Sequence, residues 1–168
     1  YNSIEWIEAM LGCYKIGAVP VNINYRYVED ELRYILNDAD AAGIAELKFG
    51  AAKKRKGLVI MTTLGTGIGT ALFTNGHLVP NAELGHLEID GIDYETKAAF
   101  SAKERENLSW DAWVERLQNY YSRLEALFSP DLIIVGGGVS KNHQEFLPKL
   151  KLQAEIVPAL KRNSAGIL

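Results

Sequence analysis

Three short motifs in this chain contain the residue types that a site for phosphates or sugars requires. The first is the glycine-spaced run LGTGIG at residues 64–69, which separates two apolar, β-branched stretches. Glycine at alternate positions permits a tight turn whose backbone N–H groups point to one side, a geometry that suits phosphate oxygens. The hydroxyl of Thr66 can add a hydrogen bond. An ordinary glycine-rich hairpin has the same letters, so the motif alone leaves both interpretations open.

The second motif is the run ELGH at residues 83–86. The carboxylate of Glu83 and the imidazole of His86 can converge on neighbouring hydroxyls of a sugar. A carboxylate accepts hydrogen bonds from hydroxyls, and histidine can donate or accept them. A surface turn with a solvated glutamate is the simpler interpretation, and the motif in isolation favours it.

The third motif is the run IIVGGGVS at residues 133–140. A strand of buried type ends here in Gly136, Gly137 and Gly138, and Ser140 is placed to cap a following helix. Such a turn leaves room for a flat ring or a phosphate at the start of the helix. A plain strand-to-helix turn is the competing interpretation.

The apolar pattern predicts the elements that must position these motifs, and its character changes near residue 40. Before this point it predicts an amphipathic helix, a short strand and a second helix, at residues 3–16, 18–23 and 29–36. After residue 57 it predicts three strands, joined by the glycine-spaced turn and by the hairpin signal Asn75-Gly76, at residues 58–63, 70–73 and 77–79.

The rest of the chain alternates helices with strands. Helices are predicted at residues 94–106, 109–127 and 144–152, and strands at residues 132–135 and 155–158. Three antiparallel strands followed by alternating helices and strands is the order of a ribonuclease-H-like α/β half-domain. The predicted fold class is therefore α/β.

Composition and charge narrow the class of protein. With 48% hydrophobic and 23% charged residues, a chain of 168 residues can bury one sizeable core, and a net charge of −3 argues against a general nucleic-acid binder. Cys13 is the single cysteine and no Cys/His cluster has metal-ligand spacing, so neither a disulfide nor a metal site is predicted. The apolar stretch 9–21 is too short to cross a bilayer. We expect a soluble, cytoplasmic protein without nucleic-acid or membrane partners.

In their order and spacing the three motifs resemble the repressor/open-reading-frame/kinase (ROK) family of sugar kinases, and the bacterial polyphosphate glucokinases in particular. The resemblance begins in NDADAAGIAE at residues 37–46 and continues through TTLGTGIGTALF at 62–73, VPNAELGHLE at 79–88, LSW at 108–110 and IVGGGVSK at 134–141. Many relatives have a zinc-binding cysteine cluster after the position of His86. This chain lacks it, as the polyphosphate-using members do.

The resemblance implies the carboxyl-terminal lobe of an actin-like ATPase, or ribonuclease-H-like, sugar kinase. It implies a glucokinase-type transfer of a phosphoryl group from polyphosphate or ATP to the 6-hydroxyl of glucose. Asp38 would be the general base that takes the proton of this hydroxyl. Asn37, Glu83 and His86 would hold the glucose, and Glu95 would replace the glutamate that follows the missing zinc cluster.

The same resemblance implies how the phosphate donor is held. Gly65, Thr66 and Gly67 would meet the donor phosphate, and Gly136, Gly137 and Gly138 the nucleotide or the distal phosphates, with Mg²⁺ on the phosphates. The basic run KKRK at residues 53–56 could attract polyphosphate, but a solvated loop is the favoured interpretation. The implied partners are glucose and polyphosphate or ATP, and a homodimer is left open.

The first forty residues resemble a different family, the AMP-forming acyl-CoA synthetases, in their amino-terminal region. The strings are NSIEW at residues 2–6, LGCYKIGAVPVN at 11–22 and YVEDELRYIL at 27–36. This resemblance ends in NDADA at residues 37–41, where the kinase resemblance begins. The chain therefore looks like a chimera, with a synthetase-like helix-strand-helix segment at residues 1–41 and a sugar-kinase lobe at residues 42–168.

A junction of this kind has chemical consequences. The Asp-rich phosphate loop of the kinase amino-terminal lobe is missing, and so is the adenylate-forming loop of the synthetases. A helix is predicted at residues 29–36, where the kinases place the strand that precedes their Asn-Asp pair. We expect a kinase lobe that is weakly active or inactive alone. The alternatives are a non-catalytic fragment that at most binds sugar or phosphate, and an acyl-CoA synthetase fragment.

Overall fold

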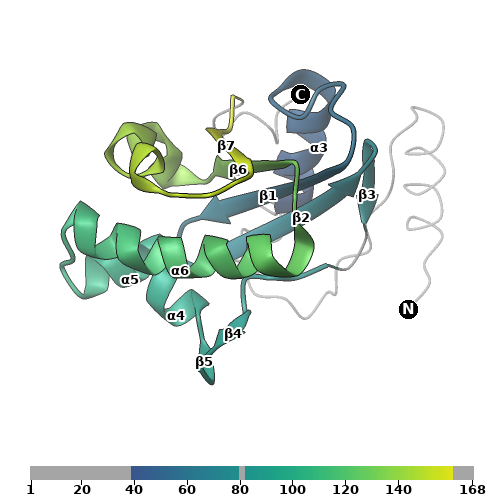
Figure 1. The fold of residues 1–168 in the computed structure, drawn as a ribbon. Helices are drawn as coiled ribbons and strands as arrows, with labels where there is room; N and C mark the ends of the chain where they lie inside the picture. The colour runs from purple at the N-terminus through teal and green to yellow at the C-terminus, as the bar shows by residue number, and fades with distance from the viewer. Residues whose placement is uncertain (1–38, 80–81, 161–168) are drawn as a thin grey trace, which may run out of the picture. The chain divides into compact units, whose positions relative to one another are not determined.

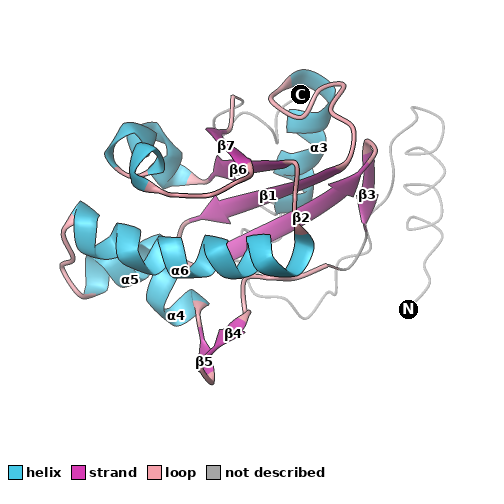
Figure 2. Cartoon of the chain, viewed as in Figure 1, coloured by secondary structure: helices cyan, strands magenta, loops and turns pink. Residues whose placement is uncertain are grey.

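A computed structural model describes residues 39–79 and 82–160 of the chain (Figures 1 and 2). The helices are α3 (Ala39–Phe49), α4 (Glu95–Ala98), α5 (Phe100–Arg105) and α6 (Trp110–Phe128), with 3₁₀ segments at Gly138–Glu145 and Leu147–Lys149. The strands are β1 (Leu58–Leu64), β2 (Ile68–Thr74), β3 (His77–Val79), β4 (Glu88–Ile89), β5 (Ile92–Asp93), β6 (Leu132–Gly136) and β7 (Glu155–Pro158). The elements predicted before residue 37 lie outside the described residues.

Five strands form one mixed sheet in the order β3-β2-β1-β6-β7. The first three pair antiparallel, as predicted, while β6 and β7 are parallel to β1. Thr63 of β1 is paired with Gly136 of β6, so the two strands end side by side. The glycine-spaced turn after β1 and the triple-glycine turn after β6 therefore leave the sheet at the same edge.

Each face of the sheet is covered by different helices, as the period-two alternation of strand side chains requires. Ile60 of β1 faces a core built with the apolar side of α6, which lies in front of the sheet in Figure 1. Met61 faces the opposite side, where partly buried residues of α3 pack against the second core cluster. No helix in the described ranges is both long enough and apolar enough to cross a membrane.

Two predicted helices differ from the structure. The helix predicted at residues 94–106 is interrupted at Ala99, whose backbone is extended with φ −56° and ψ 152°, so it becomes α4 and α5. The α-helix predicted at residues 144–152 is wrong, because short 3₁₀ segments occupy this region. Pro148 explains the second failure, since proline has no N–H and disfavours helical backbone in the residue before it.

A buried hydrogen bond joins the sheet to α6. Thr62 Oγ1 and Tyr121 Oη lie 2.7 Å apart, and both residues are fully buried. Burial raises the pKa of the Tyr121 phenol well above its ordinary value, so this residue is a neutral hydrogen-bonding group.

We expect Tyr121→Phe to lower the free energy of unfolding by about 1–3 kcal/mol, because it leaves the Thr62 hydroxyl buried without a partner. Urea unfolding measures this change. Tyr94→Phe is the matched control, since the Tyr94 hydroxyl accepts its bond from Asn119 at the surface. The double variant Thr62→Val/Tyr121→Phe should recover part of the loss. A Tyr121→Phe protein as stable as the control variant would contradict this account.

Candidate functional site

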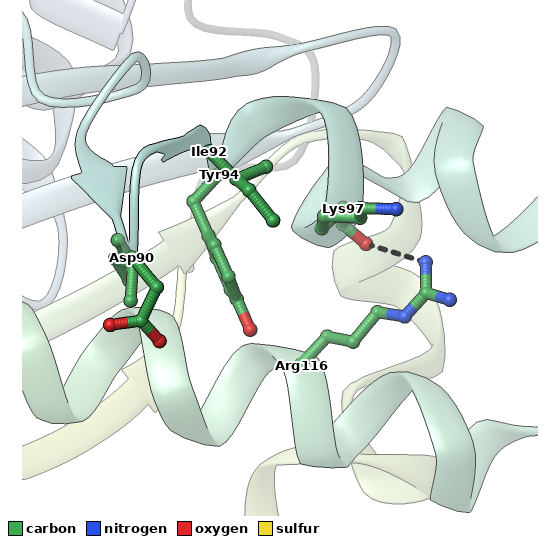
Figure 3. Close-up of a pocket in the computed structure, with 6 residues that line it drawn as sticks. Asp90, Ile92, Tyr94, Lys97 and Arg116 are labelled. Carbon is green, nitrogen blue, oxygen red and sulfur yellow. Dashed lines mark hydrogen bonds between the residues drawn. The ribbon is translucent and has the colours of Figure 1, made fainter.

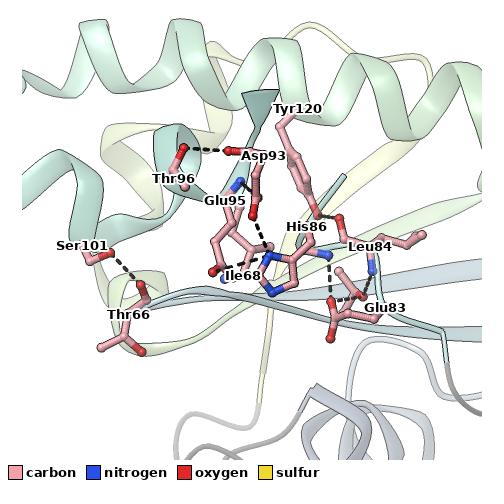
Figure 4. Close-up of polar contacts among 12 residues, drawn as sticks. Thr66, Ile68, Glu83, Leu84, His86, Asp93, Glu95, Thr96, Ser101 and Tyr120 are labelled. Carbon is pink, nitrogen blue, oxygen red and sulfur yellow. Dashed lines mark hydrogen bonds and ion pairs between the residues drawn. The ribbon is translucent and has the colours of Figure 1, made fainter. Parts of the chain in front are cut away.

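The turn between β1 and β2, at residues 65–67, is held by helix α5. Gly65 N–H donates to Gly67 O at 3.0 Å, and Ser101 contributes two bonds from its backbone and side chain. Ser101 N–H donates to Gly65 O at 3.0 Å, and Ser101 Oγ donates to Thr66 O at 2.6 Å (Figure 4). The carbonyls of the turn are thereby occupied. The N–H groups of Thr66 and Gly67 have no acceptor among the described residues.

The carboxylate of Glu95, at the start of α4, lies against the same turn. Its Oε2 accepts a hydrogen bond from Ile68 N–H at 2.7 Å, and its side chain is 22% exposed. A side chain at Gly67 would collide with this carboxylate, because a Cβ there would lie 2.5 Å from Glu95 Oε2. Glycine at position 67 is therefore needed for the close approach of Glu95 to the turn.

The ELGH motif forms a tight loop fastened to β2. Glu83 Oε1 accepts from Gly85 N–H at 2.7 Å and from the Thr70 hydroxyl at 3.2 Å. Thr70 Oγ1 in turn accepts from Leu84 N–H at 2.8 Å. No partner is found for Glu83 Oε2 in the described part of the chain, and the residue is exposed, so this oxygen is open to solvent or to a ligand.

His86 lies between carboxylates that come from different elements. Its Nδ1 is 2.8 Å from Asp93 Oδ2 and 4.0 Å from Glu95 Oε1 (Figure 4). The hydrogen bond to Asp93 raises the pKa of His86, and the negative charge of Glu95 raises it further. Burial opposes these effects, and the charges of Asp93 and Glu83 make the smallest contributions. The imidazole side chain is 60% exposed, which leaves it open to a ligand.

Helix α6 supports both the ELGH loop and α4. Tyr120 donates its hydroxyl proton to Leu84 O at 3.0 Å, and Trp113 Nε1 donates to Ala98 O at 3.0 Å inside the core. Residues 113 and 120 are seven positions apart, so they project from the same side of the helix. One rigid helix thus sets the distance between the two segments that carry Glu83, His86 and Glu95.

The structure brings together the predicted residues of the sugar site that it describes. His86 and Glu95 face each other at 4.0 Å, and Glu83 lies on the same loop as His86 without contacting either of them. Glu95 reaches the end of the predicted phosphate turn through Ile68 N–H. The second glycine turn, Gly136 to Gly138, is adjacent, since a Cβ at Gly137 would meet the backbone of Leu64. Asp38 and Asn37 lie outside the described residues, so their roles stay predictions.

The basic run at residues 53–56 precedes β1, whereas the phosphate turn follows β1. The two therefore lie at opposite ends of this seven-residue strand. Arg55 pairs with Glu155 at 2.8 Å, and both side chains are about half exposed, at 46% and 49%. The contact agrees with the solvated-loop interpretation of this run.

Sequence reasoning missed Asp93 and Ser101, which contact the site from neighbouring elements. Asp93 ends a small hairpin whose turn is Asp90-Gly91, with φ of 53° and 74°. Positive φ at both central residues is typical of a type I′ turn, and an Asp-Gly pair is a strong hairpin signal. The amino-acid sequence therefore contained a signal for this hairpin. Ser101 had no local signal.

A cavity of about 310 Å³ is lined by Ile89, Asp90, Ile92, Tyr94, Lys97 and Arg116 (Figure 3). It contains none of the residues predicted for the sugar or phosphate sites.

Within the described ranges no group of three acidic or imidazole side chains could hold a metal ion. Mg²⁺ at this site would fit best on the oxygens of a donor phosphate, which it commonly prefers to an all-protein cage.

Comparison with known proteins relates the greater part of the chain to sugar kinases. The polyphosphate glucokinase of Mycobacterium tuberculosis (strain CDC 1551 / Oshkosh) is 45% identical over 134 residues, which are 80% of this chain and 51% of the relative. The structure of an inorganic polyphosphate/ATP-glucomannokinase from Arthrobacter sp. strain KM matches with a TM-score of 0.77 and 51% identity, covering 98% of this chain and 61% of that chain.

A ROK family glucokinase from Streptomyces griseus, solved with glucose and AMPPNP, shares the fold at 21% identity. Its TM-score is 0.66, and the match covers 92% of this chain and 67% of that chain. The chain spans about half the length of the polyphosphate glucokinase of M. tuberculosis.

The beginning of the chain matches a different family. The model of the AMP-binding enzyme family matches residues 1–77. A medium/long-chain-fatty-acid–CoA/3-oxocholest-4-en-26-oate–CoA ligase of M. tuberculosis (strain CDC 1551 / Oshkosh) is 51% identical over 43 residues, which are 26% of this chain and 8% of the relative. The family match extends past the predicted boundary at residue 41 into β1 and β2. That boundary stays a prediction.

We expect Gly67→Ala to push the Glu95 carboxylate away from Ile68 N–H and to lower the free energy of unfolding by about 1–3 kcal/mol, the cost of losing a charged hydrogen bond. Faster hydrogen exchange of the Ile68 amide would report the same loss. Gly65→Ala is the matched control: neither glycine has a left-handed φ, and a Cβ at Gly65 would meet nothing within 4 Å. Equal effects of the two substitutions would show that Glu95 does not hold the turn.

Proposed function

We propose that this chain, the greater part of which belongs to the ROK family of sugar kinases, carries the acceptor-binding lobe of a glucokinase-type phosphoryl transfer. The sugar would be glucose and the donor polyphosphate or ATP. The relatives named above support the sugar-kinase chemistry, and the side-chain cluster at Glu83, His86 and Glu95 supports a sugar site in this lobe. A cytoplasmic location belongs to the same proposal, since its donor and acceptor are metabolites of that compartment.

The observation that carries the proposal is the meeting of a polar cluster with a glycine turn. Glu83 and Glu95 are carboxylates, which accept hydrogen bonds from sugar hydroxyls, and His86 can accept or donate. Glu95 contacts both His86 and Ile68, the residue that follows the turn. A hydroxyl held by the cluster would therefore be delivered close to a phosphate held by the turn, and such positioning is the main requirement of phosphoryl transfer.

The proposed mechanism assigns each group one task. Glu83, His86 and Glu95 orient the glucose, and Asp38 takes the proton of the attacking hydroxyl. The N–H groups of Thr66 and Gly67 donate to the oxygens of the transferred phosphoryl group as negative charge spreads over them. Mg²⁺ would neutralise the charge of the polyphosphate or ATP when bound. The turn at Gly136–138, next to β1, would hold the distal part of the donor.

A second function, sugar binding without turnover, is favoured by one observation. The residues at the start of the chain match the AMP-binding enzyme family. Phosphoryl transfer requires alignment of hydroxyl, base and phosphate to near-attack distance, and small misplacements are costly. The described residues include the proposed sugar ligands and both proposed phosphate turns, whereas the proposed base, Asp38, lies outside them. Sugar binding and phosphoryl transfer therefore require separate measurements.

We expect Glu83→Gln to weaken glucose binding by about 10- to 100-fold, the scale of a hydrogen bond to a charged group. Titration calorimetry measures this change. Glutamine is preferable to alanine here because its side-chain oxygen can still accept from Gly85 N–H, which Glu83 does in the structure. Glu115→Gln, on an exposed position of α6, is the control of equal charge. Unchanged binding in Glu83→Gln would remove Glu83 from the site.

We expect the chain to phosphorylate glucose at the background rate with either ATP or polyphosphate. A coupled assay of glucose-6-phosphate formation measures this rate. Clear turnover that is lost in Asp38→Asn would falsify the expectation and assign catalysis to this chain. Turnover that persists in Asp38→Asn would mean that Asp38 is not the base.

A further inference from the structure

The imidazole of His86 has one close hydrogen-bonding partner and two more distant carboxylates. Asp93 Oδ2 lies 2.8 Å from Nδ1, whereas Glu95 Oε1 lies 4.0 Å from the same nitrogen. Glu83, on the same loop as His86, adds negative charge without a direct contact. Asp93 belongs to β5, Glu95 to α4 and Glu83 to the ELGH loop, so these charges face His86 from each neighbouring segment.

Asp93 is itself fixed in place by several bonds. Its Oδ1 accepts from Glu95 N–H at 3.1 Å, and its backbone carbonyl accepts from the Thr96 hydroxyl at 2.7 Å. Its strand pairs with β4, where it lies opposite Glu88. The residue that follows, Tyr94, donates its N–H to Leu87 O at 3.0 Å and closes the hairpin at its base. The hairpin thus brings Asp93 next to His86, and these bonds hold the Asp93 carboxylate in place.

The contact determines which imidazole nitrogen carries the proton. An ionised carboxylate can only accept, so Nδ1 of His86 must be the donor. In the neutral ring the other nitrogen, Nε2, which Asp93 does not contact, is then an acceptor. The hydrogen bond made by one ring nitrogen commonly sets the role of the other in this way.

We propose that Asp93 is a positioning residue of the sugar site, which holds the Nδ1–H of His86 and presents Nε2 to a hydroxyl of the bound sugar. The inference rests on the proposed function of the Glu83, His86 and Glu95 cluster. Asp93 does not act on the sugar directly. Its effect passes through the orientation, the tautomer and the charge of His86.

The chain offers internal references for a spectroscopic test, because its three histidines are His77, His86 and His143. His143 Nδ1 lies 3.0 Å from Ser140 O, and a carbonyl can only accept, so His143 is a second ring with a protonated Nδ1. His77 is exposed on β3 and serves as the unconstrained ring.

Nitrogen-15 NMR of the imidazole side chains should find neutral His86 in the Nδ1–H form, with a pKa above the ordinary value for histidine. Asp93→Asn keeps an acceptor oxygen but removes the charge, so it should lower the pKa of His86 and mix its tautomers while His77 and His143 stay unchanged. Asp90→Asn is the matched control, since it makes the same charge change in the same hairpin, at a position whose φ of 53° suits asparagine.

The raised pKa of His86 makes the stability of the folded chain depend on pH. Protonated His86 stabilises the folded chain, so this contribution is present at pH values below the pKa of the unfolded histidine, about 6.5. It is lost as the pH rises through the higher pKa of the folded state. Asp93→Asn should flatten this part of the stability curve, whereas Asp90→Asn should leave it unchanged.

Glucose titrations of the same proteins test the link to the sugar. Asp93→Asn should weaken glucose binding about three- to tenfold, the scale of one ordinary hydrogen bond, and should shift the pH dependence of binding to lower pH. Asp90→Asn should bind as the unsubstituted chain does. If the unsubstituted chain binds glucose and Asp93→Asn binds it with the same affinity and pH profile, the inference is wrong.

The two proposals fail in distinguishable ways. A chain that binds no glucose contradicts the sugar site, and the role of Asp93 toward the sugar is then overturned with it. The NMR experiment still decides the contact by itself. If neutral His86 carries its proton on Nε2, or keeps its pKa in Asp93→Asn, Asp93 does not position the ring even where glucose binds.

Discussion

The carboxylate of Glu95 connects the two halves of the candidate site, and the surrounding structure is arranged to place it. One oxygen holds Ile68 N–H at the end of the glycine turn, and the other faces His86 in the ELGH loop. Glycine at position 67 makes room for the carboxylate. The interruption of the helix at Ala99 lets Ser101 bind the carbonyls of the same turn. Helix, turn and loop therefore fix one another around a single charged group.

Much of the sheet could be predicted because its signals are local. The β-branched run of β1 and the Asn75-Gly76 turn lie within a few residues of the elements they specify. The contacts and strands that were not predicted involve either partners far apart in sequence or very short elements. Ser101 meets Thr66 across 35 positions, which no pattern near Ala99 discloses. The strands β4 and β5 have two residues each, too few for any periodicity to detect.

Three residues of the candidate site were proposed from the sequence. Glu83 and His86 were chosen because a carboxylate and an imidazole in the ELGH motif can bind sugar hydroxyls, and Glu95 was chosen from a family resemblance. Asp93 was missed because its role depends on a hairpin that returns it to His86, and a solvated acidic residue has the same sequence signature. The structure adds the connections between motifs that are separate in sequence. The ELGH loop is hydrogen-bonded to β2 through Thr70, and the two glycine turns leave the sheet at the same edge.

The central claim is that one cluster beside the glycine turn binds the sugar, and a crystal structure of the chain with glucose tests it most directly. The account predicts sugar hydroxyls within hydrogen-bonding distance of the side chains of Glu83, His86 and Glu95. Glucose bound elsewhere, such as in the cavity beside Arg116, would contradict the account, and so would empty density at the cluster under saturating glucose.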